Sequence, residues 1–179
     1  ARLFVSDGNE QWPVDDQSVD VIFSSRALHH LSVDHAVEEI MRVLAEHGGW
    51  LLTGNIERPR DSVRSTMRRE MRSRLGAMGF EGRSHGRHAR ALFDMLVDKG
   101  GREMAPVTAA TWVRMVSPAD SLVDWEGKSG LAGVELQPER KTALLADLYR
   151  WAATKYGDPQ QPIEQEERYQ IEGVYFGAR

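Results

Sequence analysis

The sequence predicts an α/β fold, and three features of its first third carry this prediction. Residues 19–23 form a β-branched and aromatic run, with four of five positions apolar, which is typical of a strand buried on both faces. An apolar stripe at helical spacing follows over residues 33–44, with Ser32 as its expected N-cap. Residues 50–53 then form a second apolar run. Strand, helix and strand in this order make a parallel βαβ unit.

The remaining elements are expected from the same kinds of pattern. We expect a third strand of the sheet at residues 3–5, because this apolar run ends in turn-forming residues. Apolar residues recur every three or four positions in several later segments, whereas others are strand-like. Helices are predicted at 63–78, 88–97, from Pro118 onward and at 138–153, and strands at 108–116 and 167–176.

Composition narrows the class of protein. The chain has 179 residues, 41% of them hydrophobic and 28% charged, which indicates a globular domain. It has no cysteine, which excludes disulfides and thiolate chemistry, and its net charge of −4 argues against a polycation made for nucleic acid. No apolar run approaches the roughly 20 residues of a membrane span, and no export signal opens the chain. We therefore expect a cytoplasmic protein.

Polar residues follow each of the three predicted parallel strands. They are Asp7-Gly8, Ser24-Ser25-Arg26 and Gly54-Asn55. Ligands of open α/β sheets bind outside the carboxyl ends of the strands. A ligand site is therefore predicted where these three strand ends converge.

An ordered series of short motifs runs through the first 54 residues. The series is Ser6-Asp7-Gly8, Trp12-Pro13, the segment 18–25, Leu28-His29-His30-Leu31, the segment 39–44, Gly48-Gly49 and Leu51-Leu52. It resembles the second half of a class I S-adenosylmethionine-dependent methyltransferase of the small-molecule "type 11" kind. The family's glycine-rich loop and its ribose-binding acid would precede Leu3. We therefore expect this chain to be a truncated portion of a larger enzyme, starting after the natural first residue.

The resemblance implies a Rossmann-like methyltransferase sheet without its N-terminal part, a helical insertion and C-terminal antiparallel strands. Residues 1–57 would be the core part, residues 58–106 the insertion or lid, and residues 107–179 the strands and helices that complete a single partial domain. The implied cofactor is S-adenosyl-L-methionine. The implied partner is a small-molecule methyl acceptor, with no membrane and no metal involved.

The resemblance also assigns the cofactor contacts. Asp7 would bind the adenine amino group, with the backbone of Gly8 near the ring, although the family usually has alanine at that position. The methionine part would be bordered by Ser24, Ser25 and Arg26. The alternative is that Asp7 only caps a turn and that the serines form a polar strand end.

Two pairs of residues are assigned to chemistry and substrate. His29 and His30 would lie near the methyl group, where an imidazole can act as general base. The alternative for them is a packed, hydrogen-bonded pair. Asn55 and Glu57 would face the substrate. Since the cofactor carries the activated methyl group, the implied mechanism is direct displacement.

An arginine-rich segment leaves the function open to other interpretations. Residues 57–90 hold ten arginines against four acidic residues. We favour a solvated helix face, because the segment lacks the interleaved aromatic residues of single-strand binders. The alternatives are a patch for an anionic substrate, an RNA methyltransferase, or a non-catalytic methyltransferase-like module. His85 and His88 are three residues apart but lack a third ligand, so no metal site is predicted.

Overall fold

A computed structural model describes residues 2–80 and 85–178. The chain forms two compact units. Unit 1 comprises Ala1–Ile56, Ser84–Ala110 and Tyr169–Arg179, and unit 2 comprises Glu57–Arg83 and Thr111–Arg168. The division into core, insertion and C-terminal part stays a prediction.

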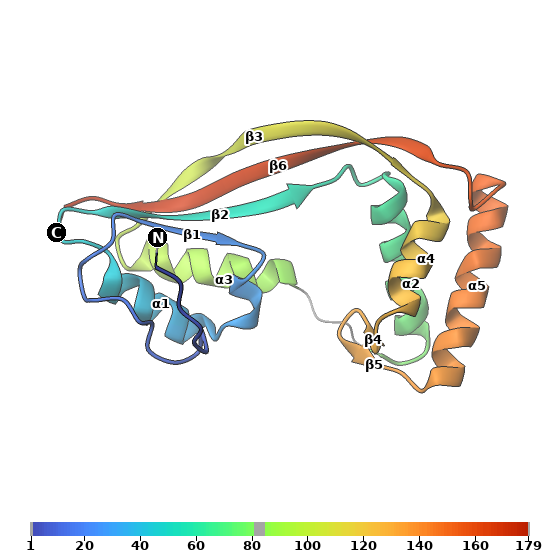
Figure 1. Cartoon of the computed structure of the whole chain (residues 1–179), viewed down its shortest axis with the longest axis horizontal. Helices are drawn as coiled ribbons and strands as arrows, with labels where there is room; N and C mark the ends of the chain where they lie inside the picture. Colours follow the sequence, from blue (N-terminus) through green and yellow to red (C-terminus); the bar gives the residue numbers. More distant parts are fainter. Residues whose placement is uncertain (1, 81–84, 179) are drawn as a thin grey trace. The chain divides into compact units, whose positions relative to one another are not determined.

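A four-stranded sheet organises unit 1, with strand order β1-β2-β6-β3. The strands are β1 (Val21–Ser25), β2 (Gly49–Glu57), β3 (Arg102–Val116) and β6 (Ile163–Phe176). β1 and β2 pair in parallel, with Val21 opposite Trp50 and Ser25 opposite Gly54. Between them run the short 3-10 helix η1 (Leu28–His30) and α1 (Val33–Val43). Figure 1 shows β6 running against its neighbours β2 and β3. The α/β class, the βαβ unit and the C-terminal antiparallel strands are confirmed.

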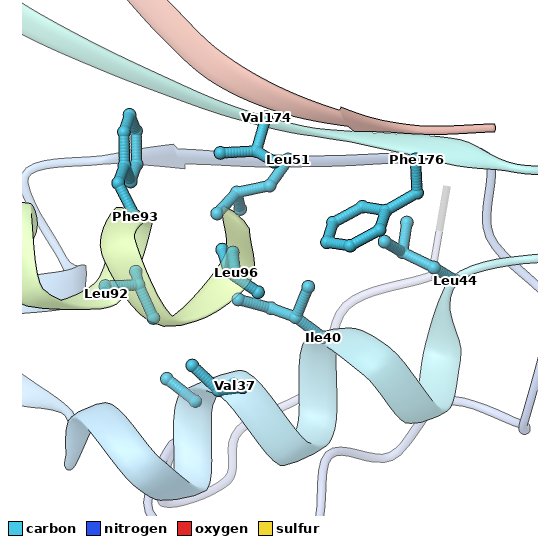
Figure 2. Packing of buried hydrophobic residues seen from close by; sticks show 10 residues of the cluster. Val37, Ile40, Leu44, Leu51, Leu92, Phe93, Leu96, Val174 and Phe176 are labelled. Carbon is cyan, nitrogen blue, oxygen red and sulfur yellow. The ribbon is translucent and has the colours of Figure 1, made fainter. Parts of the chain in front are cut away.

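The core of unit 1 lies under one face of this sheet. Helices α1 and α3 (His85–Asp98) pack together there. Figure 2 shows Ile40 and Leu96 reaching from these helices toward Leu51 and Val174 on the sheet. All four side chains are fully buried. Burial of each such side chain stabilises the fold by about 1.5–3 kcal/mol.

Two predictions about the strands are wrong. Residues 3–5 form no strand, and Leu3 is 96% exposed, because no described strand lies beside them to supply hydrogen bonds. β1 is not buried on both faces: Val21 and Phe23 are 52% and 53% exposed. The described helices cover only the face of the sheet on which Ile22 packs.

Unit 2 is mainly helical. Its helices are α2 (Val63–Ala77), α4 (Pro118–Glu126) and α5 (Pro138–Tyr156), and α2 packs against both others. Four residues of the predicted apolar stripe of α2 are buried, namely Val63, Met67, Met71 and Leu75. The fifth, Met78, follows the end of the helix and is 41% exposed. α4 begins as predicted, because Ser117 and Asp120 form a reciprocal capping box with Pro118 in the first turn. A small hairpin of β4 (Gly130–Leu131) and β5 (Val134–Glu135) is an unpredicted addition.

None of the described helices combines the length and the apolar character that crossing a membrane requires.

Candidate functional site

The loop that precedes β1 is fastened to α1 by a buried ion pair. Oε2 of Glu39 accepts the backbone N–H of Trp12 at 2.7 Å and Nη2 of Arg42 at 2.6 Å. Arg42 also donates to the backbone oxygens of Trp12 and Val14 and to the carboxylate of Asp16. The hydrogen bond from Arg42 holds the pKa of Glu39 below its ordinary value, although burial opposes this. Glu39 and Arg42 of the predicted motif therefore position the loop.

Asp7 lies in a turn that packs against the segment after η1. Its Oδ1 accepts the backbone N–H of Asn9 at 2.9 Å, so the carboxylate does cap a turn. Asn9 in turn accepts the backbone N–H of Ser32 at 2.7 Å and donates to the backbone oxygen of His30. A Cβ added at Gly8 would lie 2.6 Å from Cδ2 of Leu31, so an alanine at this position would require the end of that leucine side chain to shift. The turn thus brings Asp7 and His30 into one loop cluster.

The predicted histidine pair is formed. The rings of His29 and His30 lie 3.9 Å apart between centroids, tilted by 42°. His30 is exposed to solvent, whereas His29 is half-buried. A solvent-facing imidazole supported by a second ring is able to exchange a proton with a bound molecule.

A second polar cluster forms at the carboxyl ends of β1 and β2. The Ser25 hydroxyl donates to the backbone oxygen of Gly54 at 3.3 Å and accepts the Tyr169 hydroxyl at 2.8 Å. Tyr169 lies so close to Gly54 that a Cβ added there would overlap the tyrosine hydroxyl oxygen and ring. Only glycine at position 54 leaves space for this tyrosine.

The other predicted residues are placed separately. Ser24 is half-buried on β1, and Arg26 is exposed just after it with a positive φ of 61°. Asn55 and Glu57 are exposed near the end of β2. The roles of these four residues stay predictions.

Sequence reasoning missed two residues that shape these clusters, Asn9 and Tyr169. Asn9 follows Asp7 in a turn-forming run, which was a usable signal. Gly54 was predicted at a strand end, but the sequence did not indicate that Tyr169 packs against it. Gly54 and Tyr169 come from distant parts of the chain, and they are in contact because β2 and β6 are neighbours in the sheet.

A cavity of about 490 Å³ lies elsewhere in unit 1. It is lined by Met41, Lys99, Gly100, Arg102, Phe176, Gly177 and Ala178. Phe176 lies beside Gly48, just before β2 begins, so this cavity is at the opposite end of the sheet from Ser25 and Gly54. None of the predicted site residues lines it. Among the residues that the structure describes, no group of three potential metal ligands comes together.

Comparison with known families finds a match to a methyltransferase domain over residues 2–53. This segment, less than a third of the chain, contains the motifs from which the resemblance was inferred, and it is similar to a methyltransferase domain. The matched segment includes the Asp7 turn, the histidine pair and most of β2. A search of the curated proteins finds no match.

The chain is also similar to solved structures at low identity. A methyltransferase described as putative, from Bacillus halodurans, shares 17% identity with a TM-score of 0.48, over 97% of this chain and 77% of that one. The YcgJ protein from Bacillus subtilis shares 20% identity with a TM-score of 0.42, over 92% and 67%. A type II methyltransferase described as putative, from Anaeromyxobacter dehalogenans, shares 17% with a TM-score of 0.47, over 92% and 66%.

Proposed function

We propose that this chain takes part in methyl transfer from S-adenosyl-L-methionine to a small-molecule acceptor. The observation that carries the proposal is the methyltransferase-domain match over residues 2–53. Its motifs fall on the turn before β1 and on the carboxyl ends of β1 and β2. In open α/β sheets this is the end at which ligands bind.

The side chains present fit the polar parts of this cofactor. Asp7 is exposed, and within the described residues only its Oδ1 is engaged, which leaves Oδ2 to accept the amino group of an adenine. The hydroxyl of Ser24 and the cation of Arg26 provide donors for an amino-acid carboxylate, and Ser25, whose own proton is donated to Gly54, borders the same place. When bound, the cofactor supplies a methyl group made electrophilic by the adjacent sulfonium.

The histidine pair supplies the proton acceptor in this proposal. His30 faces solvent, and the hydrogen bond from Asn9 to its backbone oxygen fixes its place beside the Asp7 turn. A neutral imidazole there removes the proton from an acceptor hydroxyl or amine, with His29 orienting the ring. Asn55 and Glu57 orient the acceptor through exposed amide and carboxylate groups.

Calorimetry with the full-length protein tests this proposal. S-adenosylhomocysteine is titrated into the wild type, into Asp7→Ala and into Asp34→Ala. Asp34 is a matched control, because it is an exposed aspartate in the first turn of α1. Asp7→Ala is expected to weaken binding about tenfold, the effect of losing one hydrogen bond to a charged group. No binding by the wild type refutes the proposed function, and equal affinities of the three proteins remove Asp7 from the site.

A kinetic measurement tests the base. His30→Gln is expected to lower kcat by about 10²- to 10⁴-fold and to leave the affinity for S-adenosylhomocysteine unchanged. A full kcat in His30→Gln and in His29→Gln would assign the pair to packing.

The lack of cysteine supports a cytoplasmic location, which cell fractionation tests.

A further inference from the structure

The strongest unassigned feature of unit 2 is a row of arginines along α2. Arg64, Arg68 and Arg72 are spaced four residues apart and therefore share one face of the helix. We call these three residues the arginine stripe. It spans about 12 Å, from the rise of 1.5 Å per residue. Arg64 is half-buried, and Arg68 and Arg72 are exposed.

The carboxylates beside the stripe are already committed to other cations. Glu167 on β6, whose side chain is 1% exposed, binds Nε of Arg58 at 2.6 Å and accepts the Trp112 indole N–H. Asp124 on α4 binds Lys128 at 2.6 Å. These two carboxylates act electrostatically on Arg64 and Arg68, respectively.

No ion pair is formed by Arg64 or Arg68 within residues 2–80 and 85–178. In contrast, Arg74 on the neighbouring face of α2 binds both Glu70 and Asp147. The charge of Arg74 is therefore balanced by two carboxylates, whereas Arg64 and Arg68 are balanced by no ion pair in the described part of the chain.

The environment of Arg68 reflects this excess. Burial lowers the pKa of its guanidinium, and repulsion from Arg58, Arg72 and Arg64 lowers it further, whereas Asp124 opposes the shift. Arg68 is exposed overall, so the guanidinium stays charged and remains accessible. An arriving anion would relieve the repulsion among the four arginines.

We propose that the arginine stripe binds the phosphate group of a small phosphorylated molecule. Guanidinium groups bind phosphate through paired, charge-assisted hydrogen bonds, and two neighbouring arginines can hold one phosphate between them. The site lies within unit 2, and its binding is measured without S-adenosylmethionine. The test of this phosphate site therefore does not depend on whether the proposed methyl transfer is correct.

A small ligand fits the charge pattern better than a nucleic acid does. The stripe is short, and α4, which packs against α2, carries the exposed acids Asp120, Asp124 and Glu126. A long polyanion that extended past the stripe onto α4 would meet these like charges. A single phosphate group would not.

The experiment is a titration of the full 179-residue chain with inorganic phosphate, followed through the arginine Nε–H signals in NMR spectra. Variants Arg68→Gln and Arg64→Gln remove one guanidinium each, and Arg68→Lys keeps the charge without the paired donors. Arg140→Gln is the matched control, because Arg140 is an exposed arginine of α5 in the same unit. Circular dichroism checks that each variant is folded.

The proposal expects saturable shifts at Arg64 and Arg68 and a dissociation constant that rises about tenfold or more in Arg68→Gln. Arg68→Lys is expected to bind with intermediate affinity, and Arg140→Gln like the wild type. Equal shifts at all exposed arginines, or an unchanged dissociation constant in Arg68→Gln, would overturn the proposal.

A single-stranded RNA oligomer provides the last comparison. If the oligomer binds more tightly than phosphate, depends on Arg68, and loses affinity with salt at a slope of about −0.7 per neutralised phosphate, the stripe is an RNA surface and the proposal is wrong. Weak RNA binding that phosphate displaces supports a site for single phosphate groups.

Discussion

The buried ion pair between Glu39 and Arg42 allows a quantitative test of how the loop before β1 is held. Glu39→Gln keeps the size of the side chain but removes its charge. Loss of one partner of a fully buried pair costs about 3–5 kcal/mol. Arg42 is 19% exposed and keeps Asp16 and two backbone oxygens as partners, so we expect a cost of about 2 kcal/mol. Asp16→Asn is the control, because Asp16 is 72% exposed and its pair with Arg42 should be worth less than about 1 kcal/mol.

The same variant makes a prediction about pH. The pKa of Glu39 is lowered from 4.5 in the folded protein, chiefly by the hydrogen bond from Arg42. Its charge therefore stabilises the fold fully above about pH 4.5, and this contribution is lost as the pH falls through the folded-state pKa. The stability difference between the wild type and Glu39→Gln should narrow from pH 7 to pH 3.

Urea unfolding measures the free energies, and hydrogen exchange of residues 10–18 reports on the loop itself. Faster exchange in this loop is expected in Glu39→Gln and not in Asp16→Asn. Equal costs for the two variants, or a difference in stability that does not change with pH, would refute the reasoning.

Two further predictions concern close packing and a second buried carboxylate. Gly54→Ala should cost about 1–3 kcal/mol in urea unfolding, because the new Cβ displaces Tyr169 and breaks its hydrogen bond to Ser25. The added cost should largely vanish when Tyr169→Ala is the background, and full additivity would contradict the contact. Glu167→Gln should destabilise unit 2 by about 3 kcal/mol at pH 7, because it leaves Arg58 without its charged partner. Burial opposes the charge of Glu167, but the hydrogen bond from Arg58 lowers the pKa of this carboxylate below 4.5. The stability lost in Glu167→Gln should therefore become smaller as the pH falls below 4.5. A loss of stability that stays constant down to pH 3 would argue against the ion pair.

Features with a local periodicity could be predicted from the sequence. The helix α1 begins at Val33 as expected, because its apolar stripe repeats at helical spacing and needs no distant partner. Ser32 stands at its N-cap position, but its side chain makes no capping bond. Its backbone N–H is bound instead by Asn9, a contact made through the fold.

Features that depend on pairing could not be predicted in the same way. Residues 3–5 have the composition of a strand, but a strand exists only beside another one. The hairpin of β4 and β5 turns at Ala132 and Gly133, both with positive φ. Glycine at the second turn position is a common hairpin signal, whereas alanine at the first position is not. The pair Ala132-Gly133 therefore did not indicate a hairpin in the sequence.

The sequence pointed to individual residues of the candidate site but not to the contacts that hold them in place. Asp7, Ser25 and His30 were selected because of their places in motifs and at strand ends. What holds them is supplied by Asn9 and Tyr169, and Tyr169 enters from the last strand of the sheet. Such contacts follow from sheet order, which a single sequence does not display.

A crystal structure of the full-length protein with S-adenosylhomocysteine tests most directly whether the turn and strand ends of unit 1 form the cofactor site. The account predicts the adenine amino group within hydrogen-bonding distance of Asp7 and the amino-acid part beside Ser24 and Ser25. A ligand bound instead in the cavity lined by Lys99 and Arg102, at the other end of the sheet, would contradict it.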